Sequence, residues 1–428
     1  MRNIVEELGW RGLVHQTTED EKLAAWLMDH SRTVYAGFDP TSDSLHVGNL
    51  MPLLLLRRYQ RAGHRPIALA GGATGMIGDP SGKNAERNLL SVDRLQQNLQ
   101  SISVQLENIL DFDCGATSAL LVNNFDWMKE LSYLDFLRDI GKNFSVNMML
   151  AKDSIKGRLE RTDSGLSYTE FSYMLLQAYD FVHLFRQHQC ELQVGGSDQW
   201  GNITAGIDLG RRMCGAQLYG MTCPLLTKSD GSKMGKTESG SVWLSPEKTS
   251  PYAFYQYWMN VADDDAGKCL RFLTEVDREE IESLDRSREE EPHRRQSQRR
   301  LAEAVTLLVH GQAGLLAAQR ATDIFFGAEI GDLTDQQLVE IFADVPRCGL
   351  QASLLENEGY PLIDALVACG LCKSKSDGRR AIDQGGIYVN NRRREGIESR
   401  LERSDLASES VIVLRSGKKK YALLRFLA

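Results

Sequence analysis

The 428-residue sequence lacks the segments that mark membrane and exported proteins. No uninterrupted apolar run approaches the roughly 18 to 20 residues that a membrane-spanning helix needs. Acidic residues between positions 6 and 21 stand where an export signal would have a basic stretch followed by an apolar one. We therefore expect a cytoplasmic protein with no membrane partner.

Cysteine is too scattered to form a disulfide framework. The eight cysteines lie mostly in apolar segments, which is typical of reduced core residues. Cys369 and Cys372 have CxxC spacing, but no second pair or histidine cluster follows to complete the four ligands of a structural zinc site. No protein-bound metal is predicted.

Charge is divided unevenly along the chain. The net charge of −8 argues against a generic nucleic-acid binder, yet residues 360–428 contain 14 Lys and Arg against 8 Asp and Glu. The candidate RNA-binding residues are Lys373, Lys375, Arg379, Arg380, Arg392, Arg393 and Arg394. Such clusters are more often solvated surface, but their place after an acidic body favours a phosphate-binding module.

The first half of the chain alternates short apolar strands with helical patterns, which predicts an α/β catalytic domain with a parallel sheet over residues 1–226. The expected strands are Val34–Phe38, Pro66–Ala70, Ala119–Val122, Glu191–Val194 and Thr222–Leu226. Two of them end in the pairs Gly71-Gly72 and Gly195-Gly196. Because ligands bind at the carboxyl ends of parallel strands, we expect the site at that edge.

The second half is predicted to contain three further parts. Residues 227–247 form a polar, glycine-rich loop, and residues 248–329 have the charged helical pattern of an all-helical domain. We expect an acidic linker at 330–358 and a basic domain at 359–428. Within that domain, Pro361–Val389 is predicted to form two short helices and a strand.

A strand, a turn and the helix predicted for Leu50–Arg61 enclose His46-Val47-Gly48-Asn49. Free backbone amides and the dipole at such a helix start attract anions, and a histidine there can donate a hydrogen bond to phosphate. Asn49 is expected to be a weaker donor. A purely structural histidine is the alternative.

Two lysines on the glycine-rich loop form a second candidate phosphate element, Lys233-Met234-Gly235-Lys236-Thr237. Only three residues separate Gly231 from Gly235, whereas a P-loop needs four. Lysines on a mobile loop can close over phosphates as charge develops on leaving pyrophosphate. A solvated turn is the alternative, which the partner element at His46 disfavours.

These two elements resemble the HIGH and KMSKS motifs of the class I aminoacyl-tRNA synthetases. A polar stripe narrows the resemblance: Tyr173, Gln177 and Asp180 share one face of the helix predicted for Thr169–His183. With the strand end at Gln193–Trp200, the stripe resembles the amino-acid pocket of bacterial-type tyrosyl-tRNA synthetases. The resemblance implies a Rossmann-like catalytic domain, an anticodon-side helical domain and an S4-like RNA-binding domain.

The same resemblance implies the role of each site residue. For tyrosine, the implied ligands are Tyr35, Gly37, Asp79, Tyr173, Gln177 and Asp180, with Tyr35 and Asp180 on the phenol. For ATP, they are Asp39, His46, Gly48, Gly196, Asp198, Gln199, Lys233, Met234 and Lys236. The implied catalytic residues are Thr41, His46, Asn49, Lys83, Arg87, Lys233 and Lys236.

The implied reaction is that of a tyrosine–tRNA ligase. Tyrosine attacks the α-phosphate of ATP, with Mg²⁺ expected beside ATP, and the adenylate passes tyrosine to the 3′-terminal ribose of tRNA(Tyr). The resemblance implies a homodimer. It also implies rejection of phenylalanine by roughly 10⁵-fold, the figure known for tyrosyl-tRNA synthetases. The alternatives are a tryptophanyl enzyme, another nucleotidyltransferase, and an RNA-binding or splicing protein that has lost catalysis.

Overall fold

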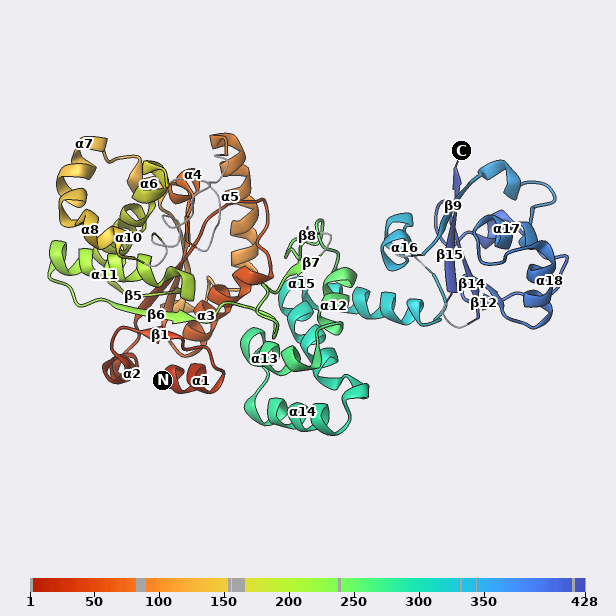
Figure 1. The fold of residues 1–428 in the computed structure, drawn as a ribbon, viewed down its shortest axis with the longest axis horizontal. Helices are drawn as coiled ribbons and strands as arrows, with labels where there is room; N and C mark the ends of the chain where they lie inside the picture. The colour runs from red at the N-terminus through yellow and green to blue at the C-terminus, as the bar shows by residue number, and fades with distance from the viewer. Residues whose placement is uncertain are drawn as a thin grey trace. The chain divides into compact units, whose positions relative to one another are not determined.

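The computed structural model describes residues 3–81, 90–152, 155, 166–237, 240–331, 333–343, 345–417 and 420–427. The chain forms two compact units, which Figure 1 shows as ribbons. The first unit comprises Met1–Thr249 and Met259–Val309, and the second comprises Ser250–Trp258 and His310–Ala428. The predicted catalytic residues Lys83 and Arg87 lie outside the described residues.

A six-stranded sheet forms the centre of the first unit. Its order is β1 (Gln16–Thr17), β6 (Tyr219–Cys223), β5 (Cys190–Gly196), β2 (Thr33–Phe38), β3 (Arg65–Ala70) and β4 (Leu120–Asn123). All neighbours are parallel except the short edge strand β1, which is antiparallel to β6. The predicted α/β fold is thus confirmed.

Four of the five predicted strands agree with the structure to within a few residues. The fifth was expected at Thr222–Leu226, whereas β6 ends at Cys223. Gly220 lies inside β6 and weakens the apolar strand signal there. A side chain at this position would collide with Ile203 of α11 (Trp200–Cys214), so the glycine lets the helix pack closely on the strand.

The helices beside the sheet follow their sequence patterns. The helix α3 spans Leu50–Arg61 as predicted, because a leucine-rich face is buried along its whole length. The helix predicted for Thr169–His183 is longer, α10 (Tyr168–His188). The Ser167 hydroxyl caps its start by accepting a hydrogen bond from the Glu170 amide, and Gln189 ends it in the left-handed region at φ 52°. Between these helices, α5 spans Val92–Glu107.

The helical part after residue 248 contains α12 (Pro251–Met259), α13 (Asp263–Leu273), α14 (Arg278–Glu290) and α15 (Gln296–Phe325). Gly311, at φ 68°, interrupts α15. By length and composition alone, Pro292–Phe325 is the one helical stretch of the described residues that could cross a membrane. Leu301, Ala302 and Val305 of this stretch are fully buried, and 33% of its most apolar window is buried inside the structure.

The second unit has a five-stranded sheet in the order β12 (Arg392–Arg393), β11 (Ile387–Val389), β14 (Val411–Ser416), β15 (Lys420–Leu427) and β9 (Arg347–Gln351). The helices α17 (Leu362–Ala368) and α18 (Lys375–Asp383) precede β11, which confirms the two short helices and strand predicted there.

The linker predicted for residues 330–358 is not what the structure shows. This stretch contains α16 (Asp335–Ile341) and β9, and β9 pairs in parallel with β15. Leu338 and Phe342 pack against Val413 on the sheet. The linker prediction was wrong because β9 is an edge strand whose residues are exposed or half-buried, which leaves little apolar signal in its sequence.

Candidate functional site

The predicted phosphate end of the site is a tight turn, η1 (Val47–Asn49), that leads directly into α3. The Gly48 amide donates a hydrogen bond to Nδ1 of His46 at 3.0 Å. The His46 amide donates to Oδ1 of Asn49, also at 3.0 Å. Asn49 therefore also holds the backbone of His46 through Oδ1, a contact that does not involve the Nδ2 donor predicted to serve phosphate.

The hydrogen bond from Gly48 determines which nitrogen of His46 can donate. Because Nδ1 accepts, the neutral ring carries its proton on Nε2. Desolvation lowers the pKa of His46 below its usual value, and the charges of Lys233 and Lys236 lower it further. His46 is thus a neutral donor near pH 7. A side chain at position 48 would collide with its ring.

The lysine loop is joined to this turn by backbone pairing. The Val47 amide donates to the Val242 carbonyl at 3.1 Å, and the Val242 amide donates to the Gly235 carbonyl at 2.8 Å. Gly235 lies at φ 83°, and any side chain there would collide with Val47. Met234 is buried beside Cys269, whereas Lys233 and Lys236 are exposed. The loop thus brings both lysines near His46.

The predicted phenol site is a buried carboxylate with its donors in place. Asp180 accepts hydrogen bonds from Asn124 Nδ2 and Trp127 Nε1, each at 2.9 Å. Burial raises the pKa of Asp180 to about 8, although these two bonds act in the opposite direction. The Tyr35 hydroxyl is buried and has no hydrogen-bond partner among the described residues, and burial followed by the charge of Asp180 raises its pKa.

A chain of hydrogen bonds connects the phenol site to Asp39. Asn124 Nδ2 also donates to the Thr74 hydroxyl at 3.0 Å, which donates to Asp39 Oδ1 at 2.7 Å. The Tyr173 hydroxyl donates to Asp39 Oδ2 at 2.8 Å. The side-chain amide of Asn124 cannot flip by 180°, because its Oδ1 accepts a hydrogen bond from the Ala73 amide at 2.7 Å. The network therefore sets the orientation of several predicted substrate ligands at once.

A second network joins the predicted ammonium and ribose ligands. Gln199 donates through Nε2 to Asp79 at 2.7 Å and accepts through Oε1 from Gln177 at 3.3 Å and Asn202 at 3.1 Å. Within the part of the chain that the structure describes, the buried Oε1 atoms of Gln177 and Gln193 have no hydrogen-bond partner. Unpaired buried polar atoms are uncommon and costly, so these oxygens are available to a polar substrate.

The remaining predicted residues line the strand ends. The Thr41 amide donates to the Asp39 carbonyl at 2.8 Å, and Gly37 lies near the end of β2. A side chain at Gly196 would crowd Asp198, the pKa of which is raised by burial and then by the charge of Asp79. Among the described residues, those predicted to bind tyrosine and those predicted to bind ATP, including the lysine loop, thus lie at one edge of the sheet.

The sequence patterns missed Asn124, Trp127 and Gln193. A signal was present for Asn124, because Asn123 and Asn124 directly follow a predicted strand, at the edge where ligands were expected. Trp127 looked like an ordinary apolar residue. Only its contact with Asp180 gives its indole N–H a role in the site.

The basic residues of the second unit differ in what holds them. Arg379 and Arg380 on α18 are exposed and have no ion-pair partner among the described residues, and Lys373 is likewise exposed. The partners of the others are Asp364 for Lys375, Glu329 for Arg392 and Glu395 for Arg393. Arg394 is different, because both oxygens of Asp405 bind it at 2.7 and 2.8 Å and it also donates to the Arg400 carbonyl. Arg394 is therefore part of the fold.

Comparison with known protein families gives two matches. Residues 28–327 match the family described as tRNA synthetases class I (W and Y). Residues 337–424 match the tyrosine–tRNA ligase SYY-like C-terminal domain, which also places β9 in that domain.

Curated relatives match along nearly the whole chain. The tyrosine–tRNA ligase of Rhodopirellula baltica is 60% identical over 423 residues, which cover 99% of this chain and 96% of that protein. The tyrosine–tRNA ligase of Roseiflexus castenholzii is 52% identical over 430 residues, with 100% of both proteins covered.

Solved structures show the same fold. A C-terminally truncated mitochondrial tyrosyl-tRNA synthetase from Aspergillus nidulans has a TM-score of 0.67 and 30% identity, and covers 76% of this chain and 95% of that one. A tryptophanyl-tRNA synthetase from Encephalitozoon cuniculi has a TM-score of 0.55 at 13% identity, with 80% and 92% covered, and shows likeness of fold alone.

Proposed function

Since the chain belongs to the tyrosine–tRNA ligases of class I, we propose that it activates L-tyrosine with ATP and transfers it to the 3′-terminal ribose of tRNA(Tyr). The observation that carries the choice of tyrosine is the buried Tyr35 hydroxyl, which lacks a partner beside Asp180. A substrate phenol can satisfy the Tyr35 hydroxyl and form a further hydrogen bond with Asp180, whereas phenylalanine leaves the buried Tyr35 hydroxyl without a partner, which is costly. The cytoplasm, where ribosomes use charged tRNA, is the proposed location.

The ammonium and carboxylate of tyrosine meet the second network in this proposal. Asp79, Tyr173 and Gln177 bind the ammonium group, and the unpaired Oε1 of Gln177 gives it a ready acceptor. The carboxylate of tyrosine and the ribose of ATP face four further residues in this proposal: Gly37, Gly196, Asp198 and Gln199. The network keeps Gln177 and Asp79 in one arrangement through Gln199, so tyrosine meets a site that is already ordered.

Catalysis then consists of positioning and charge stabilisation, because the tyrosine carboxylate attacks the α-phosphate without a covalent enzyme intermediate. Nε2 of His46 donates to phosphate, and Lys233 and Lys236 stabilise the charge that develops on pyrophosphate. We propose that Thr41, Lys83 and Arg87 also contact the phosphates and help to stabilise the charge on pyrophosphate. The described residues contain no cluster of three metal-ligating side chains, so ATP phosphates would supply most ligands of Mg²⁺.

The second unit is proposed to bind tRNA through α18. Lys373, Arg379 and Arg380 are exposed on or beside this helix, and neither arginine is neutralised by a described acidic residue. Such free cations displace counterions from RNA phosphates, which favours binding at low salt. Lys375, Arg392 and Arg393 would have to exchange a carboxylate for a phosphate, so we expect smaller contributions from them.

The protein is further proposed to be a homodimer. Several large apolar side chains between residues 133 and 168 are exposed, and we propose that they form one apolar patch: Tyr133, Leu134, Leu137, Val146, Met148, Leu150 and Tyr168. The hydroxyls of Tyr133 and Tyr168 lie 3.5 Å apart, which joins the start of α10 to α7 (Tyr133–Asp135). Contiguous apolar patches of this kind mark protein interfaces, and a second copy of the chain is the proposed partner.

A Leu134→Asp variant is expected to be monomeric in sedimentation velocity, whereas the wild type is dimeric. Leu134 is 75% exposed, so the charge disturbs the interface without entering the core. Val104→Asp is the matched control, because Val104 is 57% exposed on α5 and lies outside the patch. A wild-type monomer, or a dimeric Leu134→Asp variant, would disprove the proposed interface.

Amino-acid-dependent ATP–pyrophosphate exchange tests the proposed function, and only tyrosine is expected to support it at low concentration. Tyr35→Phe is expected to reduce the preference for tyrosine over phenylalanine by roughly 10- to 100-fold, since one buried hydrogen bond to the phenol is worth about 1–3 kcal/mol. The ratio of kcat/KM for the two amino acids measures this. Tyr59→Phe is the control, because Tyr59 is equally buried but bonds to Met221. An unchanged ratio in Tyr35→Phe would show that the phenol ligands are misassigned.

A further inference from the structure

The segment between β2 and η1 carries Thr41 and leads into His46, and α5 holds it from one side. Asn98 Nδ2 donates to the Pro40 carbonyl at 3.0 Å, and the Leu45 amide donates to Gln105 Oε1 at 2.9 Å. Arg94, Asn98 and Gln105 lie at i, i+4 and i+11, so they share one face of the helix. This polar face aligns the segment along α5.

A strap of residues 242–248 holds the same segment from another side. The Leu244 amide donates to the Leu45 carbonyl at 2.8 Å, and the Ser245 amide donates to the Ser44 hydroxyl at 3.1 Å. The strap begins where the Val242 amide bonds to Gly235 of the lysine loop. Its position therefore affects where Lys233 and Lys236 lie.

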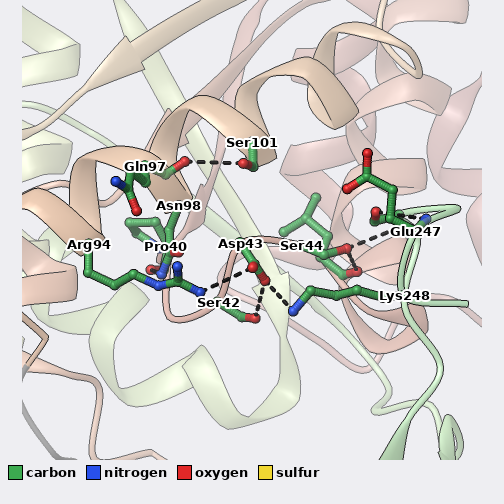
Figure 2. Close-up of polar contacts among 12 residues, drawn as sticks. Pro40, Ser42, Asp43, Ser44, Arg94, Gln97, Asn98, Ser101, Glu247 and Lys248 are labelled. Atoms are coloured by element: carbon green, nitrogen blue, oxygen red, sulfur yellow. Dashed lines mark hydrogen bonds and ion pairs between the residues drawn. The ribbon is translucent and has the colours of Figure 1, made fainter.

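Asp43 lies between α5 and the strap, as Figure 2 shows. Arg94 approaches one carboxylate oxygen at 3.1 Å, and Lys248 of the strap pairs with the other. Lys248 also lies 4.7 Å from the centre of the Trp243 ring, which in turn is 6.2 Å from the His46 ring. One carboxylate thus connects α5, the strap and the surroundings of His46.

We propose that Asp43 is a positioning residue that, through Lys248, holds the strap and so keeps the lysine loop closed over the ATP site. The inference rests on the proposed function of that loop. Asp43 and Lys248 are 31% and 33% exposed, and exposed ion pairs add little to the free energy of unfolding. Their effect therefore falls on the position of the loop, which has to open for product release and close for the reaction.

The hydrogen bond from Lys248 is the main cause that lowers the pKa of Asp43 below its usual value, with smaller effects of Ser42 and Arg94. The carboxylate of Asp43 therefore stays ionised throughout the neutral range. The ion pair with Lys248 needs no change in protonation to form. Breaking it requires the loss of one of the two partners.

The test compares Asp43→Asn, Lys248→Met and the double variant in the full-length enzyme. We expect each single variant to lower the kcat of tyrosine-dependent ATP–pyrophosphate exchange by roughly tenfold with an unchanged Kd for tyrosine. The double variant should be no slower than either single one, because both remove the same interaction. Trypsin should cleave the loop at Lys233 and Lys236 faster in all three. Glu282→Gln, which breaks the exposed pair with Arg278, is the control and should change neither readout.

The inference would be overturned by wild-type exchange in Asp43→Asn, by a loss of tyrosine affinity equal to the loss of rate, or by losses that multiply in the double variant. Unchanged trypsin cleavage with slower exchange would also overturn it, because the loop would then be in place. A wild-type enzyme without tyrosine-dependent exchange would instead disprove the proposed function.

Discussion

Removal of residues 330–428 is expected to reduce tRNA charging by roughly 10²-fold or more while tyrosine-dependent pyrophosphate exchange stays close to the wild-type rate. The second unit carries Arg379 and Arg380, which have no acidic partner among the described residues, and the loss of several proposed phosphate contacts together would lower the affinity for RNA by orders of magnitude. The described residues that are proposed to bind tyrosine and ATP all lie in the first unit. The cut belongs before α16, because a cut near residue 340 would leave part of a helix that packs on the C-terminal sheet.

A full-length variant controls for damage by truncation. Arg379→Gln with Arg380→Gln is expected to weaken tRNA binding and to flatten the dependence of log K on log salt by up to about two units, roughly one for each lost contact. Arg394→Gln should instead lower the melting temperature, since Asp405 would lose its partner. A truncated protein that still charges tRNA at the full rate, or that loses exchange as well, would show that the functions are divided differently.

His46→Ala is expected to lower the rate of pyrophosphate exchange by roughly 10²- to 10³-fold with almost no change in tyrosine affinity. In the proposed mechanism the Nε2 donor acts on phosphate as charge develops in the transition state, and the loss of one such donor costs about that much. Tyrosine is proposed to bind at Asp180 and Tyr35, and no hydrogen bond among the described residues joins His46 to either of them. Single-turnover formation of the adenylate, with tyrosine affinity measured separately, checks both halves of the prediction.

Two variants make this result specific. His30→Ala is the control, because His30 is an exposed histidine of the same unit that pairs with Asp29. Asn49→Ala should have a smaller effect than His46→Ala, since it removes only the acceptor that holds the His46 amide. Equal losses of rate and tyrosine affinity in His46→Ala would contradict the assignment to phosphate.

Local sequence was sufficient for most of the elements. The leucine periodicity of residues 50–61 defined α3 from its first residue to its last, and the alternation of strands and helices gave the parallel sheet. Both signals depend on burial of a repeating apolar face, which neighbouring residues record directly. The weak points were β6, with a glycine inside it, and β9, an edge strand without an apolar run.

The site was predicted in part for the same reason. His46, Lys233 and the stripe on α10 lie in short motifs, so their spacing is visible along the chain. Trp127 and Asp43 do not belong to such motifs, because their roles arise from contacts with residues distant in sequence. Asp43 meets Lys248 only after the strap has folded back along the segment before His46.

The sequence by itself determined the fold class and the family, and it predicted the segments proposed to carry the chemistry, because periodicity and motifs are local properties. Only the tertiary structure decided that Asn49 holds His46, that Asn124 and Trp127 orient Asp180, and that Arg394 belongs to the fold. Each of these roles depends on which partner a hydrogen-bonding group finds. That choice is made when distant segments pack together and every buried polar group competes for a partner.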